Sequence, residues 1–359
     1  MVSDWRAHAA ASELAKLVEQ LRPGELDIWL DSATPRLPET VRVNPCRPDV
    51  GWTRTELLEM GATPIEWFTG SGGAYTLPWE KAKCPDEELR SKIQALHATG
   101  RITQQEAASM MPVQALDIQP NHRVLDLCAA PGSKATQIAE VLDGRGLVVV
   151  NEPNPGRANH LVSNTQRSGH LNMVVVREDG RNFPRVAEPG FDRILVDAPC
   201  TGSGTTRKNT DVWRKWKPLH GEQMSRLQAG ILSRGALLLR PGGRMVYSTC
   251  SIDPQENEKV VEMVLERFPW LSLSEVDCEK MFPGLKTRPG MTELTKSCIR
   301  VWNDENDGSG FFIAIFTQTE VEHNSARATR AHPRDEGREP IPIEPKPPGQ
   351  KDLLSLIHI

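Results

Sequence analysis

The chain has 359 residues, with 43 Lys and Arg against 47 Asp and Glu, and its formal net charge of −4 excludes a global basic field for nucleic acid. A composition of 38% hydrophobic and 25% charged residues is ordinary for a globular protein of two or three domains. No apolar run is long enough to span a membrane, the charged N-terminus does not read as a signal peptide, and the seven cysteines include no CxxC pair. We therefore expect an intracellular protein in a reducing compartment, with no metal site, disulfide framework or membrane segment.

The first 105 residues predict a small α+β domain. Apolar residues at three- and four-residue spacing predict a helix over residues 1–20. Prolines break up the next stretch and leave room for short strands such as Thr40–Asn44. A further short helix is expected over residues 53–60.

Beyond residue 105, short apolar strands alternate with helices. Continuous apolar strands are typical of parallel strands that are covered on both faces. We therefore expect an α/β fold over residues 106–318, a Rossmann-like domain with a doubly wound, mostly parallel sheet. The expected strands are Arg123–Leu127, Leu147–Val150, Met173–Val176, Arg193–Val196, Arg244–Tyr247 and Gly310–Gln318. One expected helix follows the first strand and ends at Leu142. The others cover residues 155–168, 222–239 and 255–267.

Residues 319–359 are polar and rich in proline, which predicts a disordered tail. The last seven residues, LLSLIHI, are abruptly apolar and have no partner in the sequence. We interpret them as a short docking segment or an artefact and leave them out of the fold.

Ligands of a doubly wound sheet bind beyond the carboxyl ends of its strands. Acidic residues close three successive expected strands there, at Glu152, Asp179 and Asp197. A carboxylate after the second strand is the usual partner of ribose hydroxyls, and one after the third can accept from an adenine amino group. The first strand instead runs into small residues that allow close approach of a ligand to the backbone. That loop is Cys128, Ala129, Ala130, Pro131, Gly132, Ser133 and Lys134.

The same loop is neither GxGxxG nor GxxxxGK[ST], which disfavours a dinucleotide and a nucleoside triphosphate. An adenosine cofactor without a pyrophosphate suits the three acids, and S-adenosylmethionine fits best. The alternative is that each acid only caps the helix that follows it. Capping explains any one of the three acids more easily than it explains an acid at the end of each of three successive strands.

Cys200 and Cys250 each follow an expected buried strand and should line one crevice beside the cofactor. We interpret the other cysteines as small buried apolar residues, except Cys128, which shapes the cofactor loop. A thiolate beside a methyl donor suits cytosine, because its addition to carbon-6 makes carbon-5 nucleophilic. A second base must then remove the carbon-5 proton, and Asp197 is suited to hold the N3/N4 edge of the base.

Four motifs in this order, with the two cysteines, resemble the RNA cytosine-C5 methyltransferases of the Nop/Sun type. The likeness covers about residues 40–318. The stretch Gly204–Trp216 (GTTRKNTDVWRKW) looks like the branch that modifies transfer RNA in eukaryotes. The four motifs are Gln105–Met110 (QEAASM), Asp126–Lys134 (DLCAAPGSK), Asp197–Gly202 (DAPCTG) and Tyr247–Ser251 (YSTCS).

The resemblance implies S-adenosylmethionine as cofactor and a division of labour between the two thiols. Cys250 would be the nucleophile, and Cys200 would promote release of the covalent adduct. Asp197 would bind the target cytosine near the methionine end of the cofactor.

The resemblance also implies binding roles. The loop Cys128–Lys134 would wrap the methionine moiety, Glu152 would hold the ribose, and Asp179 would lie on the adenine side. Lys134 would also face the base. Arg42 and Asn44 in the VRVN segment would face RNA. The tRNA-modifying branch usually carries a further C-terminal RNA-binding region, whereas about 40 mostly polar residues follow the last expected strand here.

Residues 207–217 form a locally basic segment. Two tryptophans, Trp213 and Trp216, lie among its basic residues, and single-stranded RNA stacks on aromatic rings while basic side chains follow its phosphates. The alternative is a solvated helix with both tryptophans turned inward. The residues that we expect to contact RNA are Arg207, Lys208, Arg214 and Lys215.

Three other functions stay open. A DNA cytosine methyltransferase would use Cys200 as its nucleophile and would not need Cys250. A ribosomal-RNA methyltransferase of the same family would share all of the chemistry. A non-catalytic RNA-binding scaffold would need none of it. We expect tRNA as the partner, a monomer, and a location in the nucleus or nucleolus, with the cytoplasm as the alternative.

Overall fold

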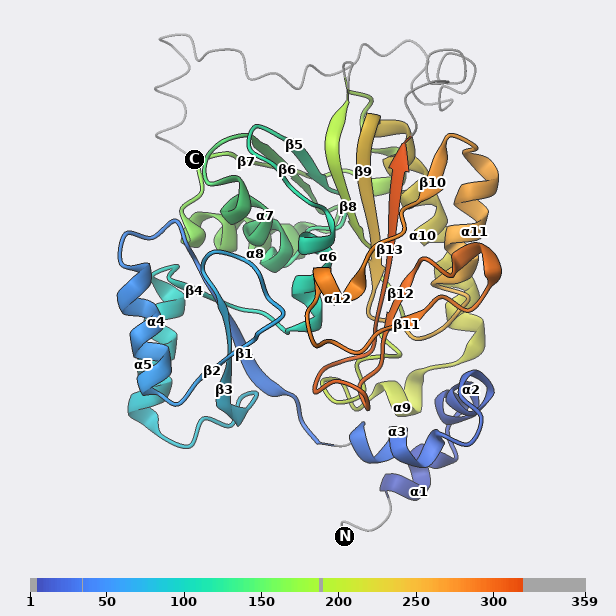
Figure 1. Cartoon of the computed structure of the whole chain (residues 1–359), viewed down its shortest axis with the longest axis horizontal. Helices are drawn as coiled ribbons and strands as arrows, with labels where there is room; N and C mark the ends of the chain where they lie inside the picture. Colours follow the sequence, from blue (N-terminus) through green and yellow to red (C-terminus); the bar gives the residue numbers. More distant parts are fainter. Residues whose placement is uncertain (1–4, 34, 187–189, 319–359) are drawn as a thin grey trace.

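The computed structural model describes residues 5–33, 35–186 and 190–318. A large sheet occupies the middle, a smaller sheet with two helices lies to one side, and three N-terminal helices lie below (Figure 1). None of the helices in these residues is long and apolar enough to cross a membrane.

The N-terminal helices are α1 (Trp5–Ala10), α2 (Glu13–Leu21) and α3 (Leu26–Ser32). The single helix expected over residues 1–20 is divided because Ser12 caps α2, its side chain accepting from the backbone of Ala15 at 3.1 Å. The helices do not join the small sheet. They pack instead beside α9 (Val212–Lys215), where the rings of Trp29 and Trp213 meet edge to face at 5.2 Å.

The small sheet is antiparallel, in the order β2-β3-β1-β4, and two helices cover it. Its core is made by alternate residues of the strands, such as Val41 and Val43, against Leu57, Ile93 and Leu96 of the helices. The strands are β1 (Pro38–Val43), β2 (Thr63–Pro64), β3 (Ala74–Glu80) and β4 (Ile102–Gln104), and the helices are α4 (Val50–Glu59) and α5 (Glu87–Ala98).

The large sheet has the order β11-β12-β13-β9-β8-β5-β6-β7, with β10 paired to β13. Five neighbouring strands are parallel, and β13 begins an antiparallel edge. The parallel strands are β5 (Arg123–Asp126), β6 (Leu147–Asn151), β7 (Met173–Val176), β8 (Phe191–Asp197) and β9 (Leu239–Thr249). The others are β10 (Leu271–Leu273), β11 (Arg288–Pro289), β12 (Ile299–Val301) and β13 (Phe311–Gln318).

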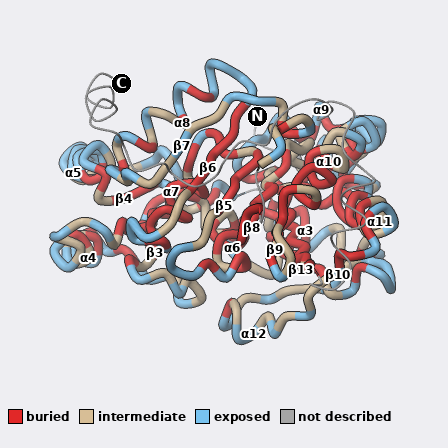
Figure 2. Tube along the Cα trace, turned by 90° about the horizontal axis from the view of Figure 1, so that it is seen from above, coloured by how far each residue is buried: buried red, intermediate tan, exposed pale blue. Residues whose placement is uncertain are grey.

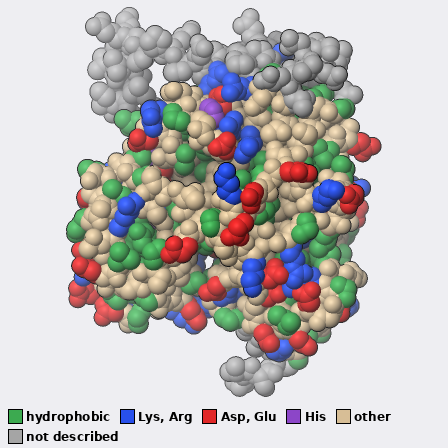
Figure 3. Space-filling view, viewed as in Figure 1, with side chains coloured by type: hydrophobic (Ala, Val, Ile, Leu, Met, Phe, Trp, Pro, Cys, Tyr) green, Lys and Arg blue, Asp and Glu red, His purple; other side chains and the backbone are tan. Residues whose placement is uncertain are grey.

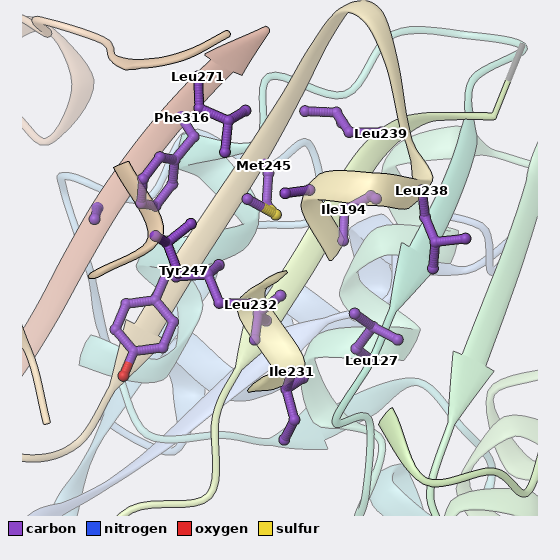
Figure 4. Close-up of a cluster of buried hydrophobic side chains, with 14 of the residues drawn as sticks. Leu127, Ile194, Ile231, Leu232, Leu238, Leu239, Met245, Tyr247, Leu271 and Phe316 are labelled. Atoms are coloured by element: carbon purple, nitrogen blue, oxygen red, sulfur yellow. The ribbon is translucent and has the colours of Figure 1, made fainter. Parts of the chain in front are cut away.

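Both faces of the large sheet are buried, which confirms the predicted α/β fold. Successive residues point to opposite faces, so Leu125 and Ile194 contribute to one apolar cluster, and Val124 and Leu195 to the other. Figure 4 shows the first cluster, and Figure 2 shows that burial is concentrated in these layers. The covering helices are α7 (Ser133–Leu142) and α8 (Pro155–Ser168), and α10 (Pro218–Leu238) and α11 (Glu258–Arg267) on the other face. Smaller helical turns are η1 (Ala108–Met110), α6 (Met111–Ala115), η2 (Gly180–Asn182), α12 (Cys278–Met281) and η3 (Glu293–Thr295).

Several boundaries differ from the expected ones, and three of them lie in the second half of the chain. Helix α10 begins at Pro218, whose fixed backbone angle suits a first helical position, rather than at residue 222. Strand β9 begins at Leu239 rather than at Arg244, and so includes the Pro-Gly-Gly sequence of residues 241–243. Helix α11 begins at Glu258 rather than at 255. The predicted tail, 319–359, lies outside the described residues.

Candidate active site

A cavity of about 400 Å³ opens at the carboxyl ends of the parallel strands. We call it the strand-end cavity. Its walls come from the segments that follow β5, β6, β7 and β8, as the rule for doubly wound sheets requires. The predicted site residues that line it are Cys128, Ala130, Glu152, Asp179, Asp197, Cys200 and Cys250.

A second cavity, of about 520 Å³, lies where the small sheet meets the domain of the large sheet. We call it the interface cavity. Pro131, Gly132, Ser133 and Lys134 line it, so the predicted cofactor loop is divided between the two cavities. Ala129 is buried in the core instead. The two cavities share Arg157, Asp197, Ala198 and Cys250.

Two side chains of α8 donate to backbone carbonyls of the loop between β5 and α7. Asn164 donates to the carbonyl of Pro131 at 2.7 Å, and Arg157 donates to that of Ala130 at 2.9 Å. Gly132 caps α7 with a φ of +114°, a conformation that side-chain-bearing residues rarely adopt. The small residues of this loop therefore set a tight turn as well as the wall of a cavity.

The acidic residues at the strand ends differ in their local contacts. Asp179 caps η2, accepting from the backbone of Arg181 at 2.9 Å, so the capping alternative holds for it. Glu152 caps no helix, because Asn154 is the cap of α8. The residue is 2% exposed, and its carboxylate accepts from the Asn154 backbone at 2.9 Å and lies 3.3 Å from the Arg157 guanidinium. Glu152 is thus a buried carboxylate in the cavity wall, held in place by Asn154 and Arg157.

Cys200 and Cys250 lie together, as the sequence predicts. Their strands, β8 and β9, are parallel neighbours, with Asp197 opposite Ser248. The two Sγ atoms are 3.2 Å apart, and both thiols are free. The hydrogen bond to Cys250 and burial raise the pKa of Cys200 well above its ordinary value, so Cys200 is a thiol at neutral pH.

A partly buried ion pair lies beside the thiols. Lys134 Nζ lies 2.7 Å from Asp197 Oδ2 and 2.8 Å from Ser109 Oγ. The other oxygen of Asp197 accepts from Ser248 Oγ at 2.8 Å. Burial disfavours the charge of Lys134, but the nearby Asp197 carboxylate outweighs it and raises the pKa of Lys134. A permanent cation therefore stands at the junction of the two cavities.

Two of the predicted RNA contacts are wrong. Arg42 is 1% exposed, and its guanidinium is bound to both oxygens of Glu140, at 2.7 and 2.9 Å. Asn44 is also buried and donates to the carbonyls of Gly100 and Ser168. Both side chains join the small sheet to the catalytic domain, where their polar groups are satisfied by protein rather than RNA.

The basic segment 207–217 is only partly a surface. Arg207 is buried, donates to the carbonyl of Pro35 at 2.8 Å and pairs with Asp307, so it too is wrongly assigned to RNA. The rings of Trp213 and Trp216 are buried against the N-terminal helices, as the inward alternative required. The exposed basic residues of the segment are Lys208, Arg214, Lys215 and Lys217.

Lys208 lines the interface cavity, whereas Arg214 and Lys215 both pair with Asp211 in their own turn of helix. Basic side chains on the face in Figure 3 are interspersed with acidic ones. The cavity itself also has basic residues that sequence reasoning missed, Lys81 and Arg157 among them. Gln105 and Ser109, from the QEAASM motif, lie in its wall, so the motif was the available signal for them. Lys81 follows β3 and carried no signal.

Asp126, the last residue of β5, is buried against the strand-end site. Its Oδ1 accepts from the Cys128 backbone at 3.1 Å, and its Oδ2 has no hydrogen-bond partner among the described residues. Burial raises the pKa of Asp126 to about 7. No group of three or more His, Cys, Asp or Glu in the described part of the chain is placed to hold a metal ion.

Known proteins share this architecture and sequence. Residues 113–317 match the family model described as 16S rRNA methyltransferase RsmB/F. A tRNA (cytosine(49)-C(5))-methyltransferase of Pyrococcus abyssi is 35% identical over 83% of this chain and 94% of its own length. A multisite-specific tRNA:(cytosine-C(5))-methyltransferase of Saccharomyces cerevisiae is 37% identical over 62% of this chain and 40% of its own. The chain spans less than half the length of several curated relatives that it matches.

A solved structure, described as a methyltransferase homolog protein from Pyrococcus horikoshii, superposes with a TM-score of 0.70 at 28% identity. The superposition covers 88% of this chain and 98% of that one. The likeness thus extends over the small sheet as well as the catalytic domain, and the expected Nop/Sun-type membership is confirmed. More than half of the chain matches one family model, with the paired thiols inside the match, and the chain belongs to the RsmB/F methyltransferase family.

Proposed function

We propose that this protein transfers a methyl group from S-adenosylmethionine to carbon-5 of cytosine in RNA. The observation that carries the proposal is the pair of thiols, 3.2 Å apart, where two cavities meet. One cavity is suited to the cofactor and the other to the base. A single nucleophile would serve addition to carbon-6 alone, whereas a second thiol supports the later steps.

The strand-end cavity fits an adenosine cofactor. Its buried Glu152 carboxylate suits two ribose hydroxyls, and Asp179 lies in the same wall. The apolar wall includes Leu127 and Ile231, which suit the face of a planar ring. When bound, S-adenosylmethionine supplies an electrophilic methyl group.

The chain's own residues then account for the chemistry of the base. Cys250 lines both cavities, and its thiolate forms the bond to carbon-6, which makes carbon-5 nucleophilic. Lys134 and Asp197 hold the polar edge of the base and balance the charge that develops on it. After methylation carbon-5 must lose its proton, and the electron pair of that bond expels the Cys250 thiolate. The Cys200 thiol, 3.2 Å away, gives its proton to the departing Cys250 sulfur, and the thiolate left on Cys200 accepts the proton from carbon-5.

We propose tRNA as the substrate. The P. abyssi and S. cerevisiae relatives are both named for tRNA, and the first matches this chain over nearly its whole length. The family description names 16S rRNA, which makes ribosomal RNA the second candidate.

The test is methyl transfer to total RNA, followed by bisulfite mapping of the protected cytosines. Label in tRNA cytosines is the expected result. Label confined to rRNA would overturn the choice of substrate. Absence of transfer to any RNA would overturn the enzymatic proposal and favour an RNA-binding scaffold.

A further inference from the structure

Glu256 joins the two loops that carry the cysteines. Its side chain is completely buried, at 0% exposed. The carboxylate accepts from the backbone N–H of Thr201 at 2.8 Å, from the Thr201 hydroxyl, and from the Ser251 hydroxyl at 2.7 Å. Thr201 directly follows Cys200, and Ser251 directly follows Cys250. One carboxylate thus bonds the neighbour of each thiol.

The carboxylate is itself held from the helix behind it. Gln228 of α10 donates to Glu256 Oε2 at 2.9 Å and to the carbonyl of Pro199 at 2.9 Å. The hydroxyl of Tyr247 donates to the backbone carbonyl of Glu256 at 2.5 Å. Residues on both sides of Cys200 are therefore connected to one fixed centre.

Other contacts join the same loops without Glu256. Ser203 Oγ lies 2.7 Å from Ser251 Oγ and accepts from the Ile252 backbone at 2.9 Å, and Gly204 N–H donates to the Cys250 carbonyl at 3.0 Å. The loops should therefore still meet when Glu256 is removed. Thr201, however, would lose the carboxylate that accepts from its backbone and its hydroxyl.

We propose that Glu256 is a positioning residue that keeps the Cys200 thiol within reach of Cys250. Glu256 is not among the described residues that line the strand-end cavity or the interface cavity. It therefore acts through the two cysteines. The inference rests on the proposed function in taking both thiols as reacting groups. The hydrogen bond to Cys250 and burial raise the pKa of Cys200, and the negative charge of Glu256 raises it further. The raised pKa favours the thiol form of Cys200.

The first test measures the distance between the thiols without RNA. Diamide oxidises two adjacent thiols to a disulfide, and mass spectrometry follows the Cys200–Cys250 product. We expect Glu256→Ala to slow this reaction by about 10-fold or more relative to Glu256→Gln, because reaction of two held groups depends steeply on their alignment. Both variants lack the negative charge that raises the pKa of Cys200, so their comparison isolates the alignment of the thiols. Glu256→Gln should restore most of the rate, since its amide has the same shape and the hydroxyls of Thr201 and Ser251 can reverse to accept.

The second test separates kcat from KM in methyl transfer. Glu256→Ala should lower kcat by about 100-fold, with KM for RNA and the affinity for S-adenosylmethionine unchanged. Glu258→Gln is the matched control, because Glu258 is also buried in this segment but accepts from Arg300 and from the backbone of Met291 rather than from Thr201 or Ser251. It should lower Tm and leave kcat per folded molecule unchanged.

Wild-type rates of oxidation and methyl transfer in Glu256→Ala would overturn the proposal, and so would a lower Tm with both rates unchanged. If Glu256→Ala does not fold, Thr201→Val takes its place, because it removes only the hydroxyl contact. Unchanged rates of oxidation and methyl transfer in Thr201→Val would then overturn the proposal. A wild-type protein that methylates no RNA contradicts the proposed function, whereas the oxidation rates still decide the positioning.

Discussion

The ammonium nitrogen of Lys134 lies 2.7 Å from Oδ2 of Asp197, and both side chains face the cavity that Cys250 lines. We expect Lys134→Met to lower methyl transfer by about 100-fold or more, because the fixed cation no longer balances charge on the base. Lys259→Met, a change at an exposed residue of α11, is the control for loss of a lysine. Equal activity of the two variants would contradict the role of Lys134.

The two cysteines should fail in different ways. Cys250→Ala should form no covalent adduct with RNA that carries a mechanism-based cytosine analogue, because the nucleophile is missing. Cys200→Ala should accumulate an adduct with ordinary RNA, since release is slowed. Denaturing gels that retain the covalent complex measure both. Trapping by Cys250→Ala, with none by Cys200→Ala, would show that the assignment is reversed.

Arg42→Met should destabilise the protein rather than weaken RNA binding. The change leaves the Glu140 carboxylate buried without its partner, and breaking such a pair costs about 3–5 kcal/mol in the free energy of unfolding. Urea unfolding measures the loss. Arg214→Met, at an exposed arginine, should leave the free energy of unfolding within about 0.5 kcal/mol. Equal stability of both variants would contradict the structural role of Arg42.

Lys208→Gln should weaken RNA binding and lower the slope of log affinity against log salt by about 1, as expected for one lost phosphate contact. Lys215→Gln should have a smaller effect, because Lys215 pairs with Asp211 at 2.5 Å and lies outside the cavity lining. Binding titrations at several salt concentrations separate the two. A larger effect from Lys215 would place the RNA on the outer face of α9.

Stability should fall between weakly acidic and neutral pH because of Asp126. Its pKa is raised from 3.8 to about 7 in the folded protein, so the folded state binds the proton more tightly than the unfolded state. The resulting stabilisation is complete below pH about 4 and is lost as the pH rises through about 7. Asp253 has a raised pKa of about 6 and acts in the same direction.

Asp126→Asn should therefore lose less stability than the wild type between pH 5 and pH 8. Asp253 is present in both proteins, so the difference between them isolates Asp126. Urea unfolding at the two pH values gives the free energies. Parallel pH dependences would contradict the raised pKa.

The sequence alone predicts the location of those site residues whose position follows from the order of the strands. Apolar runs with breakers between them predict β5 to β9, and parallel neighbours place Cys200 and Cys250 at the same edge. The acids at the strand ends lie in the predicted cavity for the same reason. The pattern of apolar residues thus predicts which strands and loops form the site.

Side-chain roles that depend on distant partners were not predictable. Arg42 lies in a motif that resembles an RNA-facing one, but its partner Glu140 is 98 positions away. Trp213 and Trp216 are compatible with either face of a short helix, and the contact with Trp29 decides between them. Lys81 enters the interface cavity only because the small sheet docks as it does. Tertiary contacts of this kind leave no local pattern.

The guanidinium of Arg42 reaches both ends of α7, with the carbonyl of Ser133 at 3.1 Å and Glu140 near the other end. Arg42 therefore joins the small sheet to α7, the helix that contains Lys134. A hinge that widened the interface cavity would have to break a buried ion pair. Under the proposed function, we therefore expect the RNA, rather than a hinge between the small sheet and α7, to deform when the cytosine is delivered.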